Sequence, residues 1–229
     1  YGESNEKIVL SYKELRQKVA SLSAYLYSIG VERGDRVAAV IPNIPEAIIM
    51  MLASSSVGAI WTSCSPDFGV NAILDRFEQV NPKVLLVSDG YMFKGKYFSI
   101  DNKVKLISDR LSSLNRIISV DYIKESNLIG KIDKVVSWNP LIEEHKTNQI
   151  NFTRLPFNHP LYIMYSSGTT GKPKSMVHSS GGTLLQHLKE HILHVNLKKE
   201  DKIFYYTTCG WMMWNWLVSG LSVGSTVVL

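Results

Sequence analysis

The stretch YSSGTTGKPKSMVH runs from Tyr165 to His178 and contains two glycines, two lysines and five serine or threonine hydroxyls. The segment Pro160–Ser167 is apolar and turns polar at its end, which predicts a strand that leads into a loop. Gly168 and Gly171 allow the backbone to approach a ligand closely, and successive backbone N–H groups in such a turn form an anion-binding nest. The stretch therefore predicts a binding site for a polyphosphate.

Eight residues of this loop are candidate phosphate ligands through backbone amides, hydroxyls or ammonium groups. They are Ser166, Ser167, Gly168, Thr169, Thr170, Gly171, Lys172 and Lys174. A Walker A loop would need glycine at the position of Pro173, so this loop is of another kind. An ordinary surface loop rich in glycine, serine and threonine is the alternative, and the density of hydrogen-bond donors counts against it.

The chain before this loop alternates between helical and strand patterns. Ser11 and Glu14 form a capping box at the start of a helix that extends to about Ile29. We predict strands at 36–41, 59–63 and 83–89, and helices at 45–57 and 70–80. Such alternation is typical of an α/β fold with largely parallel sheets and flanking helices.

The remaining segments are less regular. We predict strands at 105–108, 116–120, 134–138, 204–208 and 225–229, and helices at 110–114 and 211–221. Residues 142–158 are predicted to form a loop-rich connection. The interpretation is one partial domain over residues 1–229, with a first α/β region at 1–140 and a loop-containing region at 159–229.

Composition limits the classes of function. The net charge of +5 is spread along the chain, without the basic runs that would indicate nucleic-acid binding. The two cysteines, Cys64 and Cys209, are predicted to be free thiols in a reducing compartment. The uncharged runs 47–66 and 203–229 are long enough to cross a bilayer, but serine and glycine interrupt them, and we expect buried α/β elements there. The chain begins without methionine and stops inside an apparent strand, so we expect a longer parent protein.

The pattern YSSGTTGKPKxxxH resembles the phosphate-loop signature of the adenylate-forming enzymes, which include acyl-CoA synthetases, luciferases and peptide-synthetase adenylation domains. It departs from that signature at Ser175, where many members have glycine. Gly58–Lys96, Gly181–His191 and Thr207–Trp216 are similar to the acetoacetyl-CoA synthetase branch. The resemblance covers essentially the whole chain. It implies an incomplete N-terminal domain of a cytoplasmic enzyme of fatty-acid and ketone-body metabolism.

This resemblance implies a reaction in two halves. A carboxylate, here acetoacetate, attacks the α-phosphate of ATP to give acyl-AMP and pyrophosphate, and the thiol of coenzyme A then takes the acyl group. Six of the loop residues would hold the β- and γ-phosphates: Ser167, Gly168, Thr169, Thr170, Gly171 and Lys174. Thr169 and Lys174 would be catalytic. Ser166 and Lys172 would also bind the ATP phosphates, with Lys172 at a position where the family varies. Mg²⁺ would bridge phosphate oxygens, with its carboxylate ligand outside this chain.

The resemblance also implies two further sites. The acyl pocket and thiol tunnel would be lined by the segment Gly210–Trp216, with Trp211, Met213, Trp214 and His178 as the candidate residues. An indole N–H or Asn215 would donate a hydrogen bond to the keto oxygen of the acyl group. Lys96 occupies a position that contacts the phosphate of coenzyme A in related enzymes. The structural alternatives are core packing for the tryptophans and His178, and a solvated surface position for Lys96.

Other functions remain open at this point. A propionate or other short-acyl synthetase is the nearest alternative, and a non-catalytic nucleotide-binding segment is another. His187, Glu190 and His191 form an HxxEH pattern, with His194 one turn further on, which is the spacing of a zinc hydrolase. This chain alone is expected to be inactive, because the adenine, ribose and Mg²⁺ ligands and the mobile C-terminal domain would lie beyond Leu229. Residues 203–229 are expected to expose apolar surface and to promote association.

Overall fold

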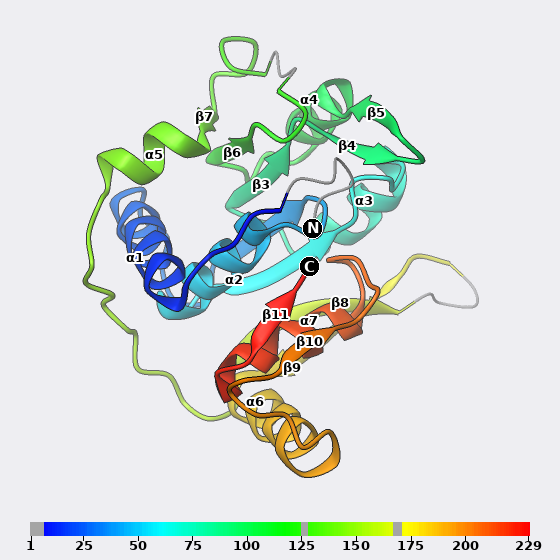
Figure 1. The fold of residues 1–229 in the computed structure, drawn as a ribbon. Helices are drawn as coiled ribbons and strands as arrows, with labels where there is room; N and C mark the ends of the chain where they lie inside the picture. Colours follow the sequence, from blue (N-terminus) through cyan, green and yellow to red (C-terminus); the bar gives the residue numbers. More distant parts are fainter. Residues whose placement is uncertain (1–6, 125–127, 167–170) are drawn as a thin grey trace.

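The structure is a computed structural model that describes residues 7–124, 128–166 and 171–229. Its main sheet has seven strands in the order β7-β6-β3-β1-β2-β8-β9 (Figure 1). All neighbouring strands in it are parallel except β8 and β9, which are antiparallel. The strands are β1 (Arg36–Val40), β2 (Ile60–Cys64), β3 (Val84–Ser88), β6 (Arg116–Val120), β7 (Val135–Ser137), β8 (Pro160–Ser166) and β9 (Lys174–Ser179). The prediction of a largely parallel α/β fold is confirmed.

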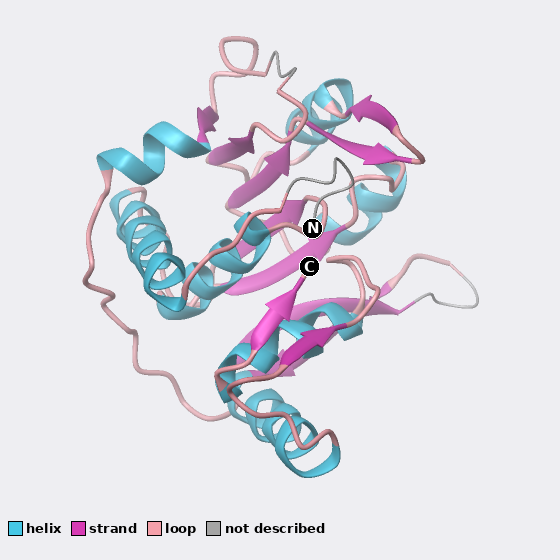
Figure 2. Ribbon diagram, in the orientation of Figure 1, coloured by secondary structure: helices cyan, strands magenta, loops and turns pink. Residues whose placement is uncertain are grey.

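Helices cover both faces of this sheet, and two small sheets lie outside it (Figure 2). The helices are α1 (Tyr12–Ser28), α2 (Pro45–Ser56), α3 (Val70–Phe77), α4 (Asp101–Arg110), α5 (Trp138–Glu144), α6 (Ser180–Lys189) and α7 (Met212–Ser219). A π-helical turn, η1 (Glu190–His194), and a 3₁₀ turn, η2 (Gly220–Val223), follow α6 and α7. The small sheets are the hairpin β4 (Gly90–Phe93) with β5 (Lys96–Ser99), and the parallel pair β10 (Lys202–Phe204) with β11 (Thr226–Val228).

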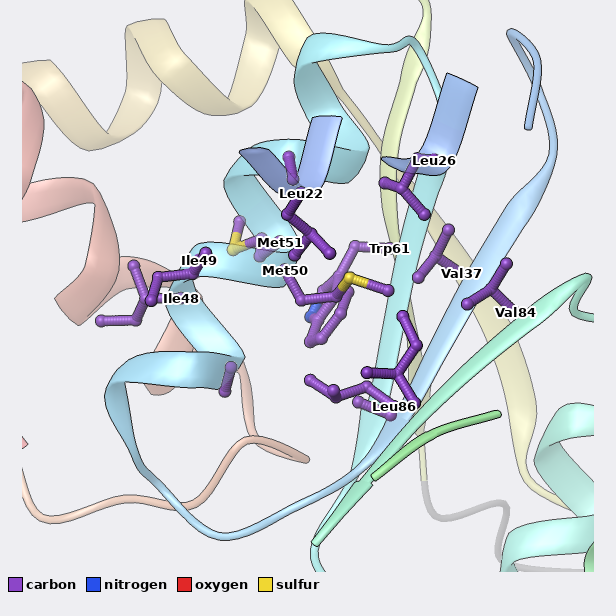
Figure 3. Close-up of a cluster of buried hydrophobic side chains, with 14 of the residues drawn as sticks. Leu22, Leu26, Val37, Ile48, Ile49, Met50, Met51, Trp61, Val84 and Leu86 are labelled. Atoms are coloured by element: carbon purple, nitrogen blue, oxygen red, sulfur yellow. The ribbon is translucent and has the colours of Figure 1, made fainter. Parts of the chain in front are cut away.

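The central strands are buried on both faces, and the period of two along each strand divides their side chains between two cores. In β1, Val37 and Ala39 pack with α1 and α2, whereas Ala38 and Val40 pack with α3 and α4. Figure 3 shows the first core, in which Met50 of α2 lies against Trp61 of β2. This two-sided burial explains why the central strands read as continuous apolar runs in the sequence.

Several predicted elements are confirmed with small shifts at their ends. The capping box is present, because the Ser11 hydroxyl accepts from the amide of Glu14 and the Glu14 carboxylate accepts from the amide of Ser11. The predicted strands at 36–41, 59–63, 83–89, 116–120 and 134–138 correspond to β1, β2, β3, β6 and β7. The 70–80 helix is shorter than predicted and ends at Phe77.

Two predictions in the middle of the chain are wrong. Residues 105–108 were predicted as a strand but lie within α4. A helix was predicted at 110–114, but α4 ends at Arg110 and residues 111–114 are not helical. Val104 and Ile107 are fully buried and Leu106 is exposed, so the segment follows helical spacing against α3. The β4–β5 hairpin and the short α5 were not predicted.

The C-terminal region has the predicted strand–helix–strand order, but its first strand is β10, which ends at Phe204. The strand predicted at 204–208 is therefore wrong beyond its first residue. Large apolar side chains remain at its surface, as expected: Tyr206 is 91% exposed and Trp211 is 63% exposed. Association of the chain through this surface stays a prediction. Within the described ranges, no helix is both long enough and apolar enough to cross a membrane.

Candidate functional site

The β8–β9 hairpin carries the part of the predicted phosphate loop that the structure describes. Ser167, Gly168, Thr169 and Thr170 lie outside the described residues. Gly171 has φ +109°, a backbone conformation that favours glycine. β9 begins at Lys174, and its register pairs Lys174 with Ser166 and Ser175 with Tyr165. We call residues 171–175 the exit arm. It begins the edge strand of the sheet next to the carboxyl end of β8, where ligands bind in open α/β sheets.

The pleat of the hairpin assigns each residue of the exit arm to one face. Directly paired residues share a face, so Lys174 and Ser166 lie on the face that also carries Met164 and Tyr162. Met164 and Tyr162 belong to the core that includes Trp214 of α7. Ser175 has the opposite orientation, and its hydroxyl reaches Gln79 in the turn that ends α3.

Three contacts bind the exit arm to α3 and the turn that follows it. The Gln79 amide nitrogen donates to the carbonyl of Pro173 at 2.9 Å, and the Gln79 side-chain oxygen accepts from the Ser175 hydroxyl at 2.9 Å. The ammonium of Lys172 lies 3.1 Å from a carboxylate oxygen of Asp75. Gln79 and Asp75 were not predicted from the sequence, because these contacts depend on how the edge strand lies over α3.

The two lysines of the exit arm have different surroundings. Lys172 is paired with Asp75, in an exposed ion pair of the kind that contributes about 0–1 kcal/mol. Lys174 is exposed, and its ammonium has no partner among the residues that the structure describes. Among the described residues of the hairpin, Lys174 therefore presents the unpaired cation on the α7 face.

The predicted acyl-pocket segment is bound to the carboxyl ends of β1 and β2. The Ser63 hydroxyl donates to the carbonyl of Cys209 at 2.6 Å, and the Cys209 thiol donates to the carbonyl of Pro42 at 3.4 Å. The Trp214 indole N–H donates to the Asn43 side-chain oxygen at 2.7 Å. Asn43 and Ser63 were missed in the sequence, although each lies at the end of a predicted parallel strand, which is where ligand-facing residues gather.

The candidate residues of this segment differ in exposure. Trp214 is fully buried and stacks on Trp61, with ring centroids 6.2 Å apart. Trp211 is exposed at the start of α7, and Met213 is half-buried. The Asn215 side-chain nitrogen contacts the Met164 sulfur at 3.1 Å, and its oxygen has no hydrogen-bond partner among the residues that the structure describes. Asn43 holds the indole N–H of Trp214, so the Asn215 nitrogen remains as a candidate donor to a ligand, in place of its contact with the Met164 sulfur.

His178 lies on the same face of β9 as Lys174. Its ring packs against Tyr162 with centroids 5.1 Å apart, and partial burial lowers the pKa of the imidazole. Burial also raises the pKa of Tyr162 to about 12. Both side chains are therefore neutral near pH 7, which suits a face that also contains the α7 segment.

Lys96 lies in the β4–β5 hairpin, apart from the exit arm. Lys94 and Gly95 form its two-residue turn with φ of +49° and +74°. Lys96 is exposed, and its ammonium makes no hydrogen bond or ion pair within the described part of the chain. The hairpin was not predicted, and it holds Lys96 at the turn rather than in a loop. Its contact with coenzyme A stays a prediction.

The HxxEH pattern forms buried packing contacts instead of an open metal site. The His191 ring lies 4.4 Å from the ring of Trp216 and shares hydrogen bonds with the Trp216 carbonyl and the Ser219 hydroxyl. His194 is exposed. Across residues 7–124, 128–166 and 171–229, no three histidine, cysteine or acidic side chains are grouped as metal ligands would be.

A GxSxG pattern at Gly220–Gly224 is likewise not a nucleophile elbow. Such an elbow joins a strand to a helix, whereas this segment follows α7 and leads into β11. The Ser222 hydroxyl donates to the carbonyl of Ser219. A hollow of about 480 Å³ near Arg116 and Lys134 lies at the amino ends of β6 and β7, which is the wrong edge of the sheet for a family-type site.

The chain is similar to several acetoacetyl-CoA synthetases and, at 37% identity over 233 residues, to a malonamoyl-CoA synthetase of Penicillium aethiopicum. Residues 3–229 match the family model for AMP-binding enzymes. The chain is 50% identical to acetoacetyl-coenzyme A synthetase of Rhizobium meliloti over 229 residues, and 46% identical to acetoacetyl-CoA synthetase of Mus musculus over 233 residues. These alignments cover 100% and 99% of this chain and 35% of each relative.

A solved structure agrees with these relatives. Acetoacetyl-CoA synthetase from Streptomyces lividans matches with a TM-score of 0.95 at 43% identity, over 100% of this chain and 34% of that one. The chain therefore spans about a third of the length of the relatives it matches.

Proposed function

Because this chain belongs to the AMP-binding enzyme family, we propose that it is part of a longer acetoacetate–CoA ligase. The reaction couples acetoacetate to coenzyme A through an acyl-adenylate and releases pyrophosphate from ATP. The similarity to acetoacetyl-CoA synthetases over the whole chain supports acetoacetate as the acid. A propionate or other short-acyl synthetase is the alternative for substrate, since all of these acids share the same carboxylate chemistry.

The observation that carries the proposal is the ammonium of Lys174 on the α7 face of the β8–β9 hairpin, which has no partner among the described residues. Charge accumulates on the leaving pyrophosphate when the carboxylate attacks the α-phosphate, and a fixed cation stabilises it. Ser166 is the cross-strand neighbour of Lys174 and supplies a hydroxyl on the same face. Gly171 and the loop residues 167–170, with Thr169 as a catalytic donor, complete the proposed phosphate site.

The α7 face also supports the assignment of the acyl pocket. His178, Trp211, Met213 and Trp214 are proposed to line it, with Trp214 as a buried wall held by Asn43. The side-chain nitrogen of Asn215, which contacts the Met164 sulfur, gives a neutral hydrogen-bond donor beside this wall. Such a group suits the keto oxygen that distinguishes acetoacetate from propionate.

Coenzyme A and Mg²⁺ enter the proposal with less support from this chain. Lys96 is proposed to contact a phosphate of coenzyme A, and the exposed ammonium on a rigid hairpin turn supports this. Mg²⁺ would neutralise charge on the ATP phosphates. The described residues bring no set of acidic ligands together for it, so no residue here is assigned to the metal.

The proposal also covers location and the limits of this chain. Cys64 and Cys209 are free and buried, which supports a cytoplasmic, reducing setting. This chain spans about a third of its relatives, and we expect it to be inactive without the rest of the polypeptide.

The test is ATP–pyrophosphate exchange by the longer protein with acetoacetate, acetate, propionate or no acid. We expect strong exchange with acetoacetate, weaker exchange with propionate and none without an acid. Hydroxamate trapping should identify the acyl group in the adenylate. Stronger exchange with propionate than with acetoacetate would mean that propionate is the acid substrate. The absence of exchange with every acid would contradict the proposed reaction.

A further inference from the structure

We propose that Gln79 is a positioning residue that holds the exit arm so that Lys174 faces the substrates. This inference rests on the proposed adenylation function. It concerns a residue outside the phosphate-loop signature, on a different part of the chain. Its basis is the set of contacts between the turn after α3 and the two residues that flank Lys174.

Gln79 holds both neighbours of Lys174 at once. Its side-chain nitrogen donates to the Pro173 carbonyl, and its side-chain oxygen accepts from the Ser175 hydroxyl, both at 2.9 Å. The nitrogen and the oxygen of the Gln79 amide therefore each bind one of the two residues next to Lys174. An amide is well suited to this role, because it offers a donor and an acceptor in fixed geometry.

Because side chains alternate along β9, these contacts also determine the direction of the Lys174 side chain. Successive side chains of a strand point to opposite faces, so a Ser175 that faces Gln79 requires a Lys174 that faces away from α3. That direction is the α7 face, where His178 packs on Tyr162. Without Gln79, the first residues of an edge strand would have little to keep them from twisting or fraying, since β9 is paired on one side only.

The position of Gln79 is itself well fixed. It lies in the turn that ends α3, where its backbone amide donates to the Arg76 carbonyl and its side chain also donates to the Asp75 carbonyl at 2.6 Å. Arg76 packs over the Phe68 and Tyr165 rings, at 5.0 and 5.7 Å from their centroids. Tyr165 is the cross-strand partner of Ser175, so the turn and the hairpin form one packed unit.

Two features of this chain fit the inference. Ser175 stands where many members of the family have glycine, and a glycine would have no hydroxyl to donate to Gln79. The second feature is that the Lys172 ammonium is paired with Asp75, which lies in α3. The α3 side therefore contacts residues 172, 173 and 175, and Lys174 between them has an ammonium without a partner among the described residues.

The test combines enzyme kinetics with amide hydrogen exchange on the longer protein. Gln79→Met keeps side-chain length and removes both hydrogen bonds to the exit arm, together with the one to the Asp75 carbonyl. Gln186→Met is the matched control, because Gln186 is an exposed glutamine on α6 whose side-chain contacts stay within its own helical segment. Both variants should retain the melting temperature of the unmodified protein to within about 2 °C, as exposed substitutions usually do.

We expect Gln79→Met to lower kcat/KM for ATP in the exchange assay about five- to tenfold, as the loss of two hydrogen bonds predicts. Gln186→Met should have no effect. In a Lys174→Ala background, Gln79→Met should change kcat/KM by less than about twofold, because Gln79 acts through Lys174. A full effect in that background, or no effect in the unmodified protein, would overturn the inference.

Hydrogen exchange separates this inference from the proposed function. The amide hydrogens of residues 171–179 should exchange about tenfold faster in Gln79→Met than in the unmodified protein, and at the same rate in Gln186→Met. This result does not depend on whether the protein adenylates an acid. Unmodified protein without ATP–pyrophosphate exchange would refute the proposed function alone. Unchanged amide protection in Gln79→Met would refute the role of Gln79 alone.

Discussion

The central strands and the edge hairpin of the same sheet differ in almost every physical respect. All five residues of β2 and all five of β3 are buried, whereas the first four residues of β9 are exposed. The centre is held by apolar contacts on both faces, and the edge by a few directional contacts to one neighbouring turn. The stable centre thus provides a rigid support, and the exposed edge carries the residues assigned to ligands.

The tryptophans show the same difference on the scale of single side chains. Trp61 in β2 is 1% exposed and stacks on Trp214, whereas Trp211 is 63% exposed. A tryptophan in this sequence therefore supports either the core or a site, and only its place in the fold decides which.

The largest expected effect tests this difference directly. Trp61→Ala should lower the free energy of unfolding by about 3–5 kcal/mol, because it removes a large side chain from a closed core. Trp211→Ala should change it by less than about 0.5 kcal/mol, as exposed substitutions do. Chemical denaturation of the two variants measures both values. Equal losses would mean that Trp211 is packed in the protein.

A smaller effect is expected from a buried histidine in the C-terminal region. His187 is 3% exposed, and burial lowers the pKa of its imidazole to about 4 from an ordinary value near 6.5. Between these values the unfolded chain binds a proton that the folded chain does not, so stability rises with pH from about 4 to 6.5. One such group changes the free energy of unfolding by up to about 1.4 kcal/mol per pH unit.

The change that tests this effect is His187→Gln, with denaturation measured at intervals from pH 4 to 7. The variant should show a shallower fall in stability towards acid than the unmodified chain. His194→Gln, at an exposed histidine on the adjoining turn, serves as the control. An unaltered slope in His187→Gln would show that His187 does not titrate as a buried neutral group.

The sequence predicted the parts of the molecule that burial determines. The alternation of apolar runs and helical patterns located β1, β2, β3, α1 and α2, because each of these elements is packed on a core with a regular period. The resemblance to acetoacetyl-CoA synthetases was also confirmed, since the relatives and the matching structure cover the whole chain.

The parts that depend on contacts between distant segments were not predicted. A strand was expected at 105–108, but this segment is helical. Four residues are too few to distinguish the period of two in a strand from the spacing of a helix. The contacts of Gln79 with the exit arm, and of Asn43 and Ser63 with the α7 segment, join residues about 95 to 170 positions apart. A local pattern carries no signal for such pairs, so these residues became visible only in the fold.

The most direct test of the account is ATP–pyrophosphate exchange by the longer protein with acetoacetate, in Lys174→Ala compared with Lys172→Ala. The two lysines are two residues apart, but only Lys172 is paired with an acidic residue in the described structure. Lys174→Ala should lower exchange by about 10²–10³-fold, the loss typical of a fixed group that stabilises transition-state charge. Lys172→Ala should lower the exchange rate only about threefold, because an exposed ion pair contributes little free energy. Equal losses, or a larger loss in Lys172→Ala, would contradict the assignment of Lys174 as the cation that the hairpin presents to the phosphates.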